Sequence, residues 1–184
     1  MFSDARSRKV VLVSHCILNQ NSISDGTADY PAADQSIVKL LLQANIGIIQ
    51  MPCPELLSLG LDRGDKCGAE RPVVVENTRI RRSLEKAESA KVLNNLVNQL
   101  VFQIAEYLHH GFKVLGIIGI NRSPSCGVDT TSDYDREVDG QGVFIARLQE
   151  ELTRRNIMLD IVGIKALEAE ESLATVEDLL AKHC

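Results

Sequence analysis

The sequence predicts an α/β protein: a parallel, Rossmann-like sheet with helices on both faces, built as one domain over residues 1–184. Apolar runs of strand length alternate with amphipathic segments, and this alternation is typical of parallel strands joined by right-handed helical crossovers. The length suits one domain that buries a sizeable core without needing a disulfide or a structural metal. We find no internal repeat and no interdomain linker in the sequence.

Two strands and two helices are predicted in the first half of the chain. The apolar run 9–14 predicts the first strand, and apolar residues at helical spacing in 31–44 predict the first helix. Residues 46–51 predict the second strand, and turn-forming residues predict a functional loop over 59–72. Residues 83–107 again carry apolar residues at helical spacing, which predicts a long crossover helix.

The second half continues the same alternation. Residues 113–120 predict the third strand, and the segment 121–140, rich in Ser, Asp, Thr and Gly, predicts a loop. A helix is predicted over about 141–155 and a fourth strand over 158–163, before a last helix that ends near Lys182. In such a sheet, the carboxyl ends of the strands line one shared crevice, where ligands bind.

The composition argues against several classes of protein. The net charge is −5, so the chain lacks the cationic surface that grips nucleic-acid phosphates, and we expect no nucleic-acid partner. No apolar stretch approaches the ~18 residues of a membrane span, so we expect no membrane partner. Five cysteines, an odd number, without a secretory leader predict a cytoplasmic location and no disulfide framework. The pattern leaves the oligomeric state open.

Three cysteines follow three of the predicted strands. Cys16, Cys53 and Cys126 each come just beyond a strand end, so the crevice should bring them together. Three thiolates are more than one nucleophile requires and one fewer than the four ligands of a closed structural zinc site. The placement therefore predicts an incompletely ligated metal centre. Cys67 is interpreted as a spare thiol and Cys184 as incidental.

The segment 123–127 around Cys126 reads SPSCG. Pro124 restricts one backbone angle and Gly127 permits unusual ones, so the run suits a tight turn that presents a sulfur and hydroxyl groups to a ligand. A plain turn that holds a buried thiol explains the segment equally well.

The segment 51–55 around Cys53 reads MPCPE, so prolines restrict the backbone on both sides of the thiol. Glu55 could act as a general base toward a metal-bound substrate. Taken alone, Glu55 is better explained as an acid in the first turn of a helix, where the helix dipole favours it. His15, beside Cys16, is interpreted as a hydrogen-bonded loop residue and is left out of the metal set.

Four short motifs occur together in this chain: VSHC over 13–16, CPE over 53–55, SPSCG over 123–127 and GQGV over 140–143. With these motifs the chain resembles the TudS-like 2-thiouracil desulfidase family, from about residue 9 to residue 161. The resemblance implies a 4Fe-4S cluster that Cys16, Cys53 and Cys126 hold by three corners, which leaves the fourth iron open. Thiolates are soft donors suited to such clusters, and an open iron can accept a thiocarbonyl sulfur.

The resemblance also implies two catalytic residues, Glu55 and Ser123. Glu55 would activate water for attack at the thiocarbonyl carbon, while Ser123 would hydrogen-bond the ring or the developing anion. The implied substrate is a small thiolated molecule, a nucleobase such as 2-thiouracil or a related thioamide. Its sulfur would leave as hydrosulfide without net electron transfer.

The chain departs from the family pattern in two segments, ISDG over 23–26 and LLSLGLDR over 56–63. We therefore expect the cluster site to be kept and the substrate pocket to differ. Two other interpretations stay open. One is a non-catalytic iron–sulfur or metal-binding protein. The other, ranked last, is a cysteine-nucleophile hydrolase, for which no histidine stands at a motif spacing that would activate Cys126.

Overall fold

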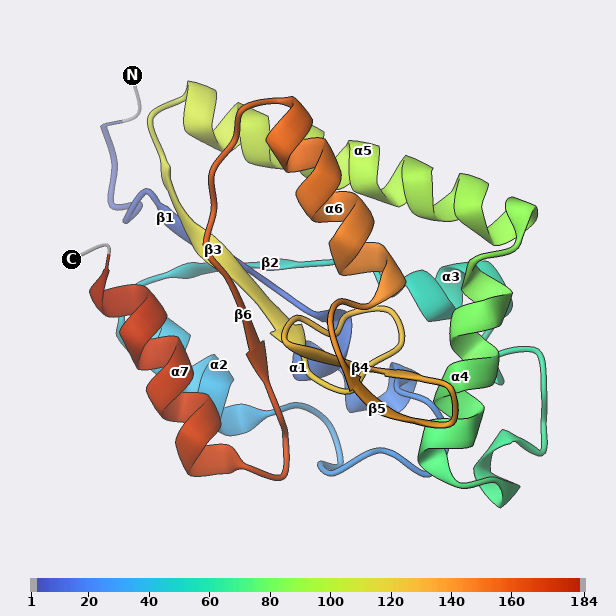
Figure 1. Ribbon diagram of the computed structural model, residues 1–184. Helices are drawn as coiled ribbons and strands as arrows, with labels where there is room; N and C mark the ends of the chain where they lie inside the picture. The colour runs from blue at the N-terminus through green and yellow to red at the C-terminus, as the bar shows by residue number, and fades with distance from the viewer. Residues whose placement is uncertain (1–2, 183–184) are drawn as a thin grey trace.

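A computed structural model describes residues 3–182 of the chain (Figure 1). Its main sheet has four parallel strands in the order β2-β1-β3-β6. The strands are β1 (Lys9–Val13), β2 (Gly47–Gln50), β3 (Lys113–Ile120) and β6 (Ile161–Ile164). The predicted α/β class with a parallel sheet is confirmed.

Helices cover both faces of this sheet (Figure 1). They are α4 (Val73–Leu84), α5 (Ala87–His109) and α6 (Val143–Arg154) on one face, and α2 (Gln35–Gln43) and α7 (Ala169–Ala181) on the other. Successive strand residues point to opposite faces of the sheet. Leu12 therefore packs in the core beneath α4, α5 and α6, and Val13 packs in the core beneath α2 and α7. Both side chains are fully buried, as a parallel sheet covered on both faces requires.

The sequence pattern misses helix α4 and places one strand too early. The polar run from Glu76 to Arg79 hides the apolar stripe of α4, whose Ile80 and Leu84 are buried in the core. Because α4 extends to Leu84, the predicted long helix begins at Ala87 and not at residue 83. The fourth strand begins at Ile161 instead of residue 158, and Met158 is exposed.

The predicted loop 121–140 contains an antiparallel hairpin of β4 (Thr130–Asp133) and β5 (Arg136–Asp139). Tyr134 and Asp135 connect the two strands with φ angles of 51° and 58°. Two consecutive residues of positive φ form the tight turn that matches the twist of a hairpin. The sequence signal was weak because neither residue is glycine. The hairpin packs against α4.

The short elements gather at the carboxyl edge of the sheet. They are α1 (His15–Leu18) and the 3-10 turn η1 (Gln20–Ser22) after β1, and α3 (Pro54–Leu59) and the 3-10 turn η2 (Gly68–Glu70) after β2. Strand β1 lies beside β3, and the crossover helix that follows β1 (α2) and the one that follows β3 (α6) cover opposite faces of the sheet. Such a switch point is where α/β sheets form their ligand crevice. Over residues 3–182, no helix has the length and apolar character needed to cross a membrane.

Candidate functional site

A cavity of about 230 Å³ lies at this switch point. All the predicted site residues line it: Cys16, Cys53, Glu55, Ser123 and Cys126. They come from the ends of three adjacent strands and lie far apart in the sequence. The structure therefore brings together the groups that the sequence placed at separate strand ends.

Local structure fixes the position of each thiol. Cys16 lies in the single turn of α1, and Cys53 caps the start of α3, where its Sγ accepts the Leu56 N–H at 3.4 Å. Pro54 occupies the first turn of α3, where a missing N–H costs nothing. Cys126 is buried in the turn after β3, and the Ser123 hydroxyl accepts its N–H at 3.0 Å.

Gly127 closes the turn that holds Cys126. A Cβ at this position would collide with the carbonyl oxygens of Thr130 and Ser123, the second at 2.8 Å. Because both oxygens are backbone atoms, we expect Gly127→Ala to lower the free energy of unfolding by about 1–3 kcal/mol. Gly47→Ala is the control, since its Cβ would come no closer than 3.3 Å to its neighbours. Denaturant unfolding measures both variants, and equal stability of the two would contradict this expectation.

Burial raises the pKa of all three thiols. Desolvation raises the pKa of Cys126 to about 12, with the charge of Cys53 as the next cause. Burial, followed by the charges of Cys126 and Cys53, raises the pKa of Cys16 well above its usual range. The pKa of Cys53 is raised by burial and then by the charge of Glu55. The metal-free thiols are therefore protonated near neutral pH, and a metal that binds them must displace their protons.

We expect iodoacetamide to alkylate Cys67 of the metal-free protein far faster than Cys126 at about pH 8, because the thiolate is the reacting form. Cys67 is exposed, whereas Cys126 is buried with its pKa raised to about 12. The alkylation rate of Cys126 should rise as the pH increases from the ordinary thiol pKa of 9.0 toward 12. Peptide mass spectrometry over time measures both rates. Denatured protein is the control, in which the two thiols should react alike.

The carboxylate of Glu55 is held from two sides inside the cavity. The Ser125 hydroxyl donates to Oε1 at 2.6 Å. Oε2 accepts from Arg63 Nε at 3.0 Å and from the Ser24 hydroxyl at 3.2 Å. Glu55 is only 6% exposed and Arg63 only 3%, so the guanidinium offsets a charge that burial would otherwise penalise. Glu55 also lies in the first turn of α3, where the helix dipole favours an acidic side chain, as the alternative interpretation of this residue predicts.

Sequence reasoning missed Ser24, Arg63 and Ser125 as contacts of Glu55. Arg63 Nη1 also donates to the carbonyl oxygens of Gly60 and Leu61, so this side chain also stabilises the backbone of the loop that carries it. Ser24 and Arg63 come from the two segments that depart from the family pattern, 23–26 and 56–63. The sequence did contain a signal for Ser125, because this residue lies inside the SPSCG motif around Cys126.

The thiols fit an iron–sulfur cluster by their chemistry. Soft thiolates are the usual ligands of such clusters, and hydrogen bonds to the sulfurs tune their reduction potential. Arg63 Nη2 lies 4.0 Å from the Sγ of Cys53, and the Ser125 hydroxyl lies 3.6 Å from the Sγ of Cys126. Within residues 3–182, no three His, Cys, Asp or Glu side chains are arranged to hold a single metal ion.

Cys67, Cys184 and His15 are not part of the predicted metal set. Cys67 is exposed and is not among the side chains that line the cavity, and Cys184 lies outside the described residues. His15 differs from its interpretation as a hydrogen-bonded loop residue, because it opens α1 and its buried Nε2 has no hydrogen-bond partner. Burial, and then the charge of Arg63, lowers the pKa of His15.

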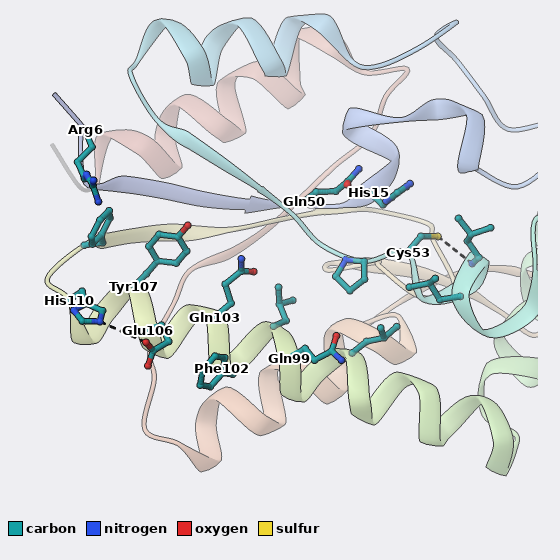
Figure 2. A pocket seen from close by; sticks show the side chains of 16 residues that line it. Arg6, His15, Gln50, Cys53, Gln99, Phe102, Gln103, Glu106, Tyr107 and His110 are labelled. Carbon is teal, nitrogen blue, oxygen red and sulfur yellow. Dashed lines mark hydrogen bonds and ion pairs between the residues drawn. The ribbon is translucent and has the colours of Figure 1, made fainter. Parts of the chain in front are cut away.

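A larger, open cavity of about 830 Å³ lies beside the first, between β2 and α5 (Figure 2). Gln103 and Tyr107 of α5 project toward the strands there, and Cys53 and His15 lie at one end. Of the predicted site residues this cavity includes only Cys53. The acid, the serine and the other two thiols all line the smaller cavity, which is therefore the candidate functional site.

Comparisons with known proteins identify no family for this chain. No protein-family model matches the sequence. An uncharacterized protein of Methanocaldococcus jannaschii is 29% identical over 163 residues, which cover 89% of this chain and 86% of that protein. Among solved structures, the 4Fe-4S-dependent thiouracil desulfidase TudS aligns with 94% of this chain and 99% of its own, at 16% identity and a TM-score of 0.42. Because so low a TM-score does not establish a common fold, the proposals below rest on the residues of this chain.

Proposed function

We propose that this protein is an iron–sulfur-dependent, non-redox desulfidase that acts on a thiolated nucleobase or a related thioamide, such as 2-thiouracil. The observation that carries the proposal is the meeting of three thiols and a buried, fixed carboxylate in one cavity. The motif resemblance from VSHC to GQGV supports the same chemistry. In this proposal Cys16, Cys53 and Cys126 hold the cluster.

Cys16, Cys53 and Cys126 would hold a 4Fe-4S cluster, which would supply Lewis-acid polarisation of the thiocarbonyl group of the substrate. Glu55 takes a proton from the water that attacks the thiocarbonyl carbon. The water oxygen forms the new C–O bond and the C–S bond breaks. The second proton of the water goes to the sulfur, which leaves as hydrosulfide without any change in oxidation state, and Glu55 then releases its proton to solvent. Ser123, which lines the same cavity, donates a hydrogen bond to the ring or to the developing anion.

Cys126 and Glu55 distinguish this proposal from two alternatives, a cysteine-nucleophile hydrolase and a non-catalytic iron–sulfur protein. A cysteine-nucleophile hydrolase needs a thiol of lowered pKa beside a base, whereas burial raises the pKa of Cys126 to about 12. A non-catalytic iron–sulfur protein would have no need of Glu55. Replacement of Glu55 therefore distinguishes a carrier from an enzyme.

Cluster-loaded protein is expected to release sulfide from a free thiolated base or nucleoside faster than from intact thiolated transfer RNA. The cavity of about 230 Å³ suits a small ligand, and a net charge of −5 disfavours a polyanion. Sulfide release from the base, nucleoside, nucleotide and transfer RNA measures this preference. Faster turnover of the transfer RNA would contradict the small-molecule assignment. Absence of sulfide from every thioamide offered to loaded protein would overturn the desulfidase.

A further inference from the structure

The hydroxyl of Ser125 lies where three groups of the proposed site meet. It is 2.6 Å from Oε1 of Glu55, 3.3 Å from the hydroxyl of Ser123 and 3.6 Å from the Sγ of Cys126. Ser125 is 2% exposed, so these protein groups largely surround it. Between Glu55 and Ser123, the two residues proposed to act on the substrate, Ser125 is the connecting side chain.

The proton of this hydroxyl has one best acceptor. A hydroxyl carries a single proton, and the short distance to a carboxylate is typical of a charge-assisted hydrogen bond. The Ser125 proton therefore points to Glu55, which leaves the lone pairs of Ser125 Oγ to accept from the Ser123 hydroxyl in the substrate-free protein. This gives a directed chain from Ser123 through Ser125 to Glu55. When substrate binds, the single proton of Ser123 turns to the substrate, and Ser125 keeps its hydrogen bond to Glu55.

The two serines of SPSCG have different local tasks. Ser123 Oγ accepts the backbone N–H of Ser125 at 3.3 Å and that of Cys126 at 3.0 Å, so it shapes the turn. The hydrogen-bond neighbours of the Ser125 hydroxyl are side chains of the site. Removal of the Ser125 hydroxyl should therefore spare the turn that presents Cys126.

We propose that Ser125 is a positioning residue that fixes the Oε1 atom of Glu55 and, before substrate binds, the hydroxyl of Ser123. This inference rests on the proposed function. Arg63 and Ser24 hold only Oε2, so without Ser125 the other carboxylate oxygen loses its partner and the carboxylate can turn about its own axis. A misplacement of about 1 Å can cost on the order of a hundredfold in rate.

The test compares Ser125→Ala with Ser89→Ala, a matched control at a buried serine on α5 that does not line the cavity. Ser125→Ala should lower kcat for the thiolated substrate by about a hundredfold. Its KM and its iron content should stay at the wild-type values, because all three thiols remain and only one hydroxyl is lost from the cavity wall. Ser89→Ala should keep the wild-type kcat.

A second measurement needs no turnover. In metal-free protein, Ser125→Ala, Glu55→Ala and the double variant form a thermodynamic cycle for unfolding, since each single substitution removes the hydrogen bond. Because the two side chains share a hydrogen bond, the double variant should lose less stability than the sum of the two single losses.

Two outcomes separate this inference from the proposed function. A fully active Ser125→Ala, or strictly additive stability losses, would overturn the positioning role and leave the desulfidase in place. Loaded wild-type protein that releases no sulfide from any thioamide would overturn the desulfidase, and the positioning role would fall with it.

Discussion

Replacement of Cys16, Cys53 or Cys126 singly by serine is expected to abolish or cripple cluster binding. The three thiols line one cavity, and each would hold one corner of the cluster, for which a hydroxyl is a harder and poorer ligand. Anaerobically prepared wild-type protein should be brown, with about four irons per chain. Iron and sulfide content together with the visible absorption spectrum measure the loss in each variant.

Cys67→Ser is the control for these variants, because Cys67 is exposed and is not among the side chains that line the cavity. It should keep the full iron content, and so should Cys184→Ser. Equal loss of iron from all five substitutions would contradict the ligand assignment. So would colourless, iron-free wild-type protein after careful anaerobic reconstitution.

Glu55→Gln is expected to keep the cluster and to lower turnover by a factor of about a hundred to ten thousand, which is the usual contribution of a general base. The amide retains the size of the carboxylate but cannot accept a proton from water. The experiment measures the iron content and the rate of sulfide release of the same anaerobic preparation, so that loss of the cluster is separated from loss of the base.

Glu76→Gln is a matched control for that variant. Glu76 is also 6% exposed and pairs with Arg71 and Arg79, but it does not line the cavity. Both substitutions remove a buried carboxylate from an ion pair, and only the one at Glu55 should stop turnover. An undiminished rate in cluster-loaded Glu55→Gln would favour another base or a different reaction. If wild-type protein prefers another thioamide to 2-thiouracil, the comparison is made on that substrate.

The regular elements were predictable where their pattern is local. Strand β3 agrees with its predicted bounds, because the apolar run 114–120 between Lys113 and Asn121 is typical of a buried strand. Helix α4 was missed because the polar run from Glu76 to Arg79 hides its apolar stripe, of which Ile80 and Leu84 are buried in the core. The hairpin β4–β5 was missed because Tyr134 and Asp135 adopt a turn conformation that usually signals itself through glycine.

The sequence by itself determined the fold class and the meeting place of the three cysteines. Both follow from local order along the chain, since each cysteine comes just after a strand and parallel strands end at one edge. Only the tertiary structure decided what surrounds Glu55. Its partners Arg63, Ser24 and Ser125 are 8, 31 and 70 residues away in the sequence. A single hydrogen bond between distant side chains leaves no period in the sequence, so the contact exists only once loops from three strand ends have packed together.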